Sequence, residues 1–203
     1  MAMLSDAEVD DIWTLGKAVD LSDCHYGLFH DNKTYLHTSP YYYFLCGVAK
    51  YSSAEKIVEI GTYRGGSTKA LSKGMAEGGK LLTFDVSDFE PDFRKYPNVK
   101  SIVADPLDAS SIMECRAYLG NTVDLIYIDG THNGAITLKQ MKTYVKAFSP
   151  RWVVCDDVGL SQSMRDFFSA AERAFPGFRD VSRTHPHIRR PAEGFGVWKN
   201  SNK

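Results

Sequence analysis

The sequence predicts a Rossmann-like α/β fold, a three-layer sandwich around a mostly parallel, seven-stranded sheet with an antiparallel hairpin at one edge. Residues 56–60 form a short β-branched run, followed by a glycine turn and a helical stretch. This order is the first unit of a doubly wound sheet, in which ligands bind at the carboxyl ends of the strands. Strand and helix patterns then alternate along the chain. The last two strand patterns have no helix between them, as in an antiparallel pair.

Composition indicates one globular domain with a sizeable core. The chain has 203 residues, a formal net charge of −1 and 43% hydrophobic residues. We expect a helical prefix at residues 1–50, packed as a lid on a core domain at 51–203. Without a polybasic face or an acidic tail, neither nucleic acid nor a membrane is an expected partner. The polar N-terminus is unlike a secretory leader, and the four scattered cysteines suit a reducing compartment, so the predicted location is cytoplasmic.

The prefix contains two predicted helices. Ser5 and Glu8 form a capping box for the first helix. Pro40 begins the second, which runs to about Lys50. The polar stretch Cys24–Lys33 between them is expected to be a loop.

The core domain continues the alternation. A helix is predicted over Thr68–Ala76, and each of the next four strands ends at aspartate. The predicted strands are Lys80–Phe84, Lys100–Ala104, Val123–Ile128 and Arg151–Cys155. Helices are expected over Asn133–Phe148 and after the capping residue Ser161. The antiparallel pair is expected near Phe178–Val181 and Phe195–Lys199.

The glycine turn after residue 60 is a candidate cofactor loop. A dinucleotide fingerprint needs glycine two positions after Gly61, where backbone approaches a pyrophosphate. Tyr63 stands there instead, which disfavours a dehydrogenase. S-adenosylmethionine has no phosphate, and Glu59 is placed to act as a counter-ion for its amino group. The alternative is a tight βα connection without a ligand.

Three carboxylates are expected close together at the ends of two strands. Asp129 follows one strand, and Asp156 and Asp157 follow another. Three close like charges are costly unless they are neutralised, and a hard divalent cation neutralises them. The sequence therefore predicts a metal site, Mg²⁺ first and Ca²⁺ or Mn²⁺ also suitable. Without metal, Asp157 would cap a helix and Asp129 would face the cofactor.

From Tyr35 to Val158 the sequence resembles the class I S-adenosylmethionine-dependent methyltransferases. Residues 59–67, EIGTYRGGS, match the pattern of the metal-dependent small-molecule O-methyltransferases, of which catechol O-methyltransferase is one branch. The paired aspartates suit a second branch that acts on sugars and antibiotics, because the catechol branch has Asn where this chain has Asp157. The resemblance implies that the core domain is an S-adenosylmethionine-binding methyltransferase domain.

The resemblance also implies roles for individual residues. The loop residues Gly61, Thr62 and Tyr63 would hold the methionine end, with Ser67 on its carboxylate. Asp85 would accept both ribose hydroxyls, because a carboxylate offers about four lone-pair sites. Further cofactor contacts are expected from Asp105 at the adenine end and from His37 in a segment that passes over the cofactor.

His132 is the candidate general base. It lies three residues after Asp129, where the catechol branch has a proton-accepting lysine, and imidazole titrates near neutrality. A neutral His132 is expected, with Asp129 as its catalytic partner and metal ligand. The alternative is a hydrogen-bonding role at the start of the next helix. The basic segment Arg183–Arg190 is either a solvated loop or a grip for an anionic acceptor.

The predicted function is therefore metal-dependent O-methylation of a small hydroxylated molecule. Two alternatives remain open: a metal-free N- or O-methyltransferase, and a binding module without catalysis. An aromatic prefix helix could also bury against a second copy in a homo-oligomer.

Overall fold

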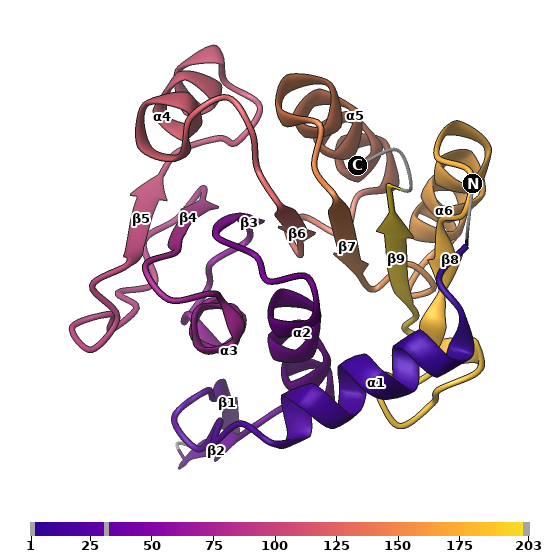
Figure 1. The fold of residues 1–203 in the computed structure, drawn as a ribbon, viewed down its shortest axis with the longest axis horizontal. Coiled ribbons are helices and arrows are strands. Elements are labelled where there is room, and N and C mark those ends of the chain that lie inside the picture. The colour runs from indigo at the N-terminus through magenta and orange to yellow at the C-terminus, as the bar shows by residue number, and fades with distance from the viewer. Residues whose placement is uncertain (1–2, 31–32, 201–203) are drawn as a thin grey trace.

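The fold is built on one seven-stranded sheet with the order β5-β4-β3-β6-β7-β9-β8 (Figure 1). The structure is a computed structural model that describes residues 3–30 and 33–200, except the side chains of residues 26–30 and 33–37. The strands are β3 Lys56–Ile60, β4 Lys80–Asp85, β5 Val99–Val103, β6 Leu125–Ile128, β7 Trp152–Asp156, β8 Arg179–Asp180 and β9 Phe195–Lys199. The predicted fold class is confirmed.

The strand order creates a switch point in the middle of the sheet. The chain runs from β3 outward through β4 to β5, then returns to the other side of β3 as β6. All pairs from β5 to β7 are parallel, whereas β9 pairs antiparallel with both β7 and β8. The predicted antiparallel edge pair is therefore confirmed. In an open α/β sheet, ligands bind where the strand order reverses, which here is the edge beyond β3 and β6.

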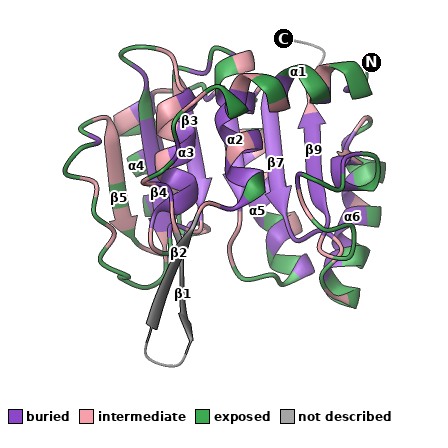
Figure 2. Cartoon of the chain, turned by 90° about the horizontal axis from the view of Figure 1, so that it is seen from below, coloured by how far each residue is buried: buried purple, intermediate pink, exposed green. Residues whose placement is uncertain are grey.

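Alternate residues of each strand face opposite helical layers, as pleating requires. Ile57 packs with α1, α2 and α3, whereas Val58 packs with α4, α5 and α6. Figure 1 shows the two layers on either side of the sheet, and Figure 2 shows that β7 and β9 are buried. The helices are α1 Asp6–Lys17, α2 Pro40–Tyr51, α3 Gly66–Gly74, α4 Ala109–Leu119, α5 Gly134–Phe148 and α6 Gln162–Ala174.

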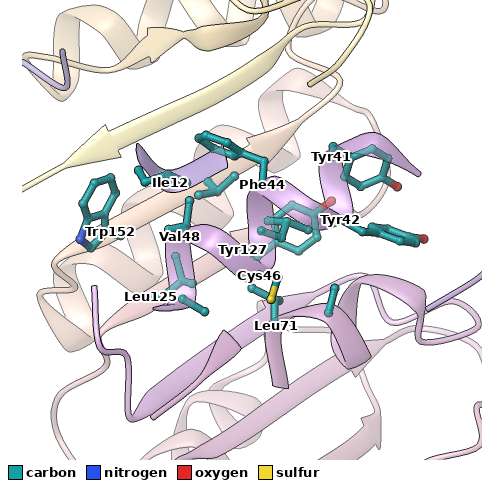
Figure 3. Close-up of a cluster of buried hydrophobic side chains, with 14 of the residues drawn as sticks. Ile12, Tyr41, Tyr42, Phe44, Cys46, Val48, Leu71, Leu125, Tyr127 and Trp152 are labelled. Carbon is teal, nitrogen blue, oxygen red and sulfur yellow. The ribbon is translucent and has the colours of Figure 1, made fainter. Parts of the chain in front are cut away.

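The prefix helices belong to the same hydrophobic core as the sheet. Residues of α2 lie in one cluster with sheet residues, as Figure 3 shows for Phe44, Tyr127 and Leu125. A Cβ at Gly16 would lie 1.8 Å from the carbonyl oxygen of Tyr43, so α1 and α2 cross with their backbones in contact.

Two local predictions differ from the structure. The stretch expected to be a loop enters an antiparallel pair, β1 Tyr26–His30 with β2 Lys33–His37. Polar residues interrupt two short runs of strand-forming aromatic and aliphatic residues in this stretch, so the sequence pattern favoured a loop. Helix α4 was not predicted, because it buries only Ser111, Cys115 and Leu119 and so has little apolar periodicity.

Cys24, Cys46, Cys115 and Cys155 are all buried and unpaired. Among the described residues, no helix combines the length and the apolar character that crossing a membrane requires.

Candidate active site

A cavity of about 330 Å³ opens at the carboxyl ends of β3, β4 and β6. It lies at the switch point of the sheet, and its size falls within the range of small-molecule sites. Most of the predicted site residues line it together: Gly61, Thr62, Tyr63, Ser67, Asp85, Asp129 and His132. The fold therefore brings the candidate cofactor loop and the candidate base to one cavity.

Gly61 fixes the turn that begins the cavity. Its φ is +103°, and a Cβ there would lie 1.9 Å from the carbonyl oxygen of Asp129. Only glycine combines this conformation with such a close approach. The turn after β3 consequently lies directly against the end of β6.

Tyr63 connects the loop to the end of β4. Its backbone N–H donates to Oδ2 of Asp85 at 2.8 Å, and its φ is +43°. Oδ1 of Asp85 accepts from the N–H of Ser87 at 3.2 Å. The Asp85 carboxylate is therefore held by two backbone donors at the cavity wall, which fits its predicted role without testing it.

Glu59 lies beneath the loop and is not among the residues that line the cavity. It is fully buried, and it accepts hydrogen bonds from Ser67 Oγ at 2.6 Å and from Thr68 Oγ1 at 2.5 Å. Burial raises the pKa of Glu59 to about 7, against the lowering effect of these hydroxyls. In this arrangement the Glu59 carboxylate accepts hydrogen bonds from the first turn of α3 and does not line the cavity. Direct contact of Glu59 with a cofactor therefore stays a prediction.

His132 lies between two carboxylates. Its Nε2 is 3.1 Å from Oδ1 of Asp129 and 3.3 Å from Oδ2 of Asp157. The other oxygen of Asp129 accepts from the buried Tyr127 hydroxyl at 3.0 Å. The hydrogen bond to Asp129 raises the pKa of His132 above its ordinary value, and the charge of Asp157 adds to the effect. The sequence analysis expected a neutral imidazole, but these carboxylates favour the protonated form.

Asp156 and Asp157 are buried and paired with Arg189, from the basic segment expected to be a solvated loop or a grip for an anionic acceptor. Nη2 of Arg189 lies 3.2 Å from Oδ2 of Asp156 and 2.7 Å from Oδ1 of Asp157. The remaining oxygen of Asp156 accepts from the N–H of Asp157 at 2.9 Å. Burial raises the pKa of both carboxyls, and Arg189 opposes that rise. Neither aspartate is among the lining residues of the cavity.

The donor set does not fit the predicted divalent cation in this arrangement. Each of the six oxygens of Asp129, Asp156 and Asp157 already faces a protein donor. Among the described residues, no three His, Cys, Asp or Glu side chains are grouped so that they could hold a metal. The magnesium prediction is therefore not supported, because arginine and histidine supply the neutralising charge.

Of two further predicted cofactor residues, Asp105 is not among the described residues that line the cavity, and the His37 side chain is not described. Oδ1 of Asp105 accepts from the N–H of Leu107 at 2.8 Å, and the neighbouring Pro106 lines the cavity instead. His37 is the last residue of β2, and its side chain lies outside the described residues. Both assignments stay predictions.

The lining residues also include several that were not selected from the sequence, among them two tyrosines and a glutamine. Tyr41 and Tyr42 come from α2, and their rings lie 4.7 Å apart (Figure 3). Gln140 comes from α5, is 3% exposed, and its Oε1 accepts no hydrogen bond from any described residue. A glutamine inside an amphipathic helix was the available signal, but only packing shows that it faces a cavity.

A cavity at the switch point of a Rossmann-like sheet defines an α/β protein with a candidate ligand site at the carboxyl ends of its strands. Residues 58–158 match the family model described as a methyltransferase domain. No curated protein matches the chain. The family match supports a class I S-adenosylmethionine-dependent methyltransferase.

Several solved structures share the fold of this chain. The O-methyltransferase from Bacillus cereus in complex with SAH is 17% identical, with a TM-score of 0.61 over 97% of this chain and 92% of that chain. Cofactor-bound Rv0187 from MTB is 17% identical, with a TM-score of 0.63 over 96% and 92%. A putative O-methyltransferase from Klebsiella pneumoniae is 19% identical, with a TM-score of 0.59 over 97% and 91%.

Proposed function

We propose that this protein transfers a methyl group from S-adenosylmethionine to a hydroxyl of a small molecule. One observation carries the proposal: the glycine loop, Asp85 and His132 line a single cavity. A cofactor held by the loop would therefore present its methyl group to an acceptor beside the imidazole. O-methylation is favoured because two of the structural neighbours are described as O-methyltransferases.

The cavity offers a partner for each end of this cofactor. The Asp85 carboxylate would accept from the ribose hydroxyls. The Ser67 hydroxyl donates to Glu59 at 2.6 Å, and its hydrogen would turn to the methionine carboxylate when that end of the cofactor is bound. Gln140 lies one helical turn before Tyr144, whose hydroxyl donates to the carbonyl oxygen of Pro106 at 2.9 Å. The unpaired Oε1 of Gln140 would therefore lie near the loop after β5 that contains Pro106. An adenine amino group bound there would donate a hydrogen bond to it. A buried acceptor without a donor costs about 1–3 kcal/mol, so a ligand that supplies the donor gains affinity.

When bound, S-adenosylmethionine supplies a sulfonium methyl group that an acceptor oxygen attacks, and the S–C bonding pair stays on sulfur. The protein orients the acceptor and removes its proton. Because Nε2 of His132 faces Asp129 and Asp157, it carries the ring hydrogen, and Nδ1 accepts the proton when the ring is neutral. The raised pKa of His132 makes the neutral ring a stronger base and moves its working range to higher pH. The two carboxylates stabilise the imidazolium that forms. This arrangement needs no metal on the acceptor oxygen.

Binding and turnover test the proposal separately. S-adenosylhomocysteine should raise the melting temperature, because it binds only the folded state, whereas NAD should not. Equal stabilisation by the two would contradict the cofactor assignment. Incubation with methyl-labelled S-adenosylmethionine and a panel of phenols, sugars and amines should give labelled ethers. Labelled amines alone would favour the N-methyltransferase alternative, and cofactor binding without any product across broad panels would favour a binding module.

A further inference from the structure

Arg189 is held in the interior by partners on three sides. Besides Asp156 and Asp157, its Nε lies 3.2 Å from Oε2 of Glu193, and its guanidinium lies 4.7 Å from the ring centre of Tyr41. Its side chain is only 21% exposed, although a long arginine in a surface segment is usually solvated. Aromatic stacking adds to the charge pairing, because a guanidinium is attracted to a ring face.

The segment that carries Arg189 is anchored on both sides. It lies between the short 3-10 helix Val181–Arg183 and β9, and the preceding residue Ile188 is fully buried. The next residue, Arg190, pairs with the other oxygen of Glu193, but 82% of its side chain is exposed. Of two adjacent arginines, one is therefore built into the acidic cluster and the other remains at the surface.

We propose that Arg189 is a built-in counter-ion that takes the place of a divalent cation at the ends of β6 and β7. A cation that bound Asp156 and Asp157 would have to displace the guanidinium from both. It would also be repelled by Arg189 at short range in a poorly solvated site. Mg²⁺ in particular gives up its water reluctantly. The cluster would become a metal site only when Arg189 is removed. This inference concerns the carboxylates alone and does not rest on methyl transfer.

Metal binding to four proteins tests the inference without cofactor or acceptor. Mn²⁺ is the probe, because electron paramagnetic resonance counts the bound ion directly, and calorimetry repeats the titration with Mg²⁺. Arg189→Met removes the charge and keeps much of the apolar stem. Arg189→Lys keeps the charge, and Arg190→Met is the matched control. We expect Arg189→Met to bind one Mn²⁺ at least 30-fold more tightly than the wild type. The lysine variant and the control should behave as the wild type does.

Two results would overturn the proposal. The first is wild-type protein that binds one Mn²⁺ as tightly as Arg189→Met does, with binding lost in Asp156→Asn. The second is a folded Arg189→Met that gains no affinity. If Arg189→Met does not fold in the absence of metal, its folding is followed by circular dichroism during Mn²⁺ titration. Folding that Mn²⁺ restores, and that the same concentration of K⁺ does not restore, supports the proposal. Failure of Mn²⁺ to restore folding contradicts the proposal that Arg189 takes the place of a divalent cation.

Discussion

Nε2 of His132 lies 3.1 Å from Oδ1 of Asp129, at the cavity that the candidate cofactor loop also lines. The same nitrogen is 3.3 Å from Asp157, so two strand ends hold one imidazole. His132 also has a φ of +47° and directly precedes Asn133, which caps α5. A side chain fixed by its backbone and by two carboxylates is suited to accept a proton in one orientation.

Replacing His132 should separate turnover from cofactor binding. His132→Ala removes the proton acceptor, and a positioned general base contributes about 10²–10⁴-fold, so turnover should fall by that factor. The affinity for S-adenosylhomocysteine should stay within about twofold, because the proposed cofactor contacts are elsewhere. His132→Gln keeps a hydrogen-bonding side chain that cannot take a proton. Steady-state kinetics and calorimetry measure both effects, and near-normal turnover of the glutamine variant would make His132 a structural residue.

Asp85 should be needed for cofactor affinity. Asp85→Ala removes the acceptor for the ribose hydroxyls and for the Tyr63 N–H. Leaving buried hydrogen-bonding groups without a partner costs about 1–3 kcal/mol, so S-adenosylhomocysteine should bind about 10- to 100-fold more weakly. Asp88→Ala is the control, since Asp88 is exposed in the same loop and does not line the cavity. Isothermal titration calorimetry measures both variants. Equal affinities for the wild type and Asp85→Ala would remove Asp85 from the site.

Gln140 should recognise the amino group of the adenine base. Gln140→Leu removes the unpaired Oε1 and should weaken S-adenosylhomocysteine binding by about tenfold, the value of one buried hydrogen bond. The analogue with hypoxanthine in place of adenine lacks that amino group, so its affinity should be the same for the wild type and Gln140→Leu. If Gln140→Leu lowers the affinity for both ligands equally, Gln140 stabilises the cavity wall and does not recognise the base. Lys139→Leu, on the neighbouring exposed position, is the control.

Glu59 should make stability fall as the pH rises towards neutrality. Its pKa is about 7 in the folded protein, above its ordinary value of 4.5, so the folded state binds more protons than the unfolded state between these values. Its contribution to the unfolding free energy is therefore complete below about pH 4.5 and is lost as the pH passes 7. The change is on the order of 3 kcal/mol.

Urea denaturation at pH 5 and pH 8 checks this expectation. Glu59→Gln cannot titrate, so its stability relative to the wild type should be higher at pH 8 than at pH 5. Glu55→Gln, at an exposed position, should show no such difference. If the unfolding free energies of the wild type and Glu59→Gln change equally between pH 5 and pH 8, Glu59 is not the source of the pH dependence.

Local patterns were sufficient to predict most of the fold. The β-branched run at 56–60, the alternation after it and the paired last strands each depend on neighbours in the chain, and β3, β7 and β9 follow within a residue or two. Gly61, Tyr63, Ser67 and Asp85 could be selected because a turn between a strand and a helix has a fixed place in a parallel sheet. Helix α4 was missed because its apolar periodicity is weak, and the β1–β2 pair was missed because polar residues interrupt its strand-forming runs.

The sequence by itself determined the sheet, the glycine turn that lines the cavity and the presence of three carboxylates at one edge. It did not determine what neutralises them, because Arg189 is 32 residues from Asp157 and is drawn there only when the segment before β9 packs. It likewise could not show that Glu59 turns away from the cavity or that Gln140 faces it. Those outcomes depend on side-chain packing between distant segments, which only the tertiary structure decided. The physical reason is that a buried polar group needs a hydrogen-bond or ion partner, and packing determines which partner is close enough.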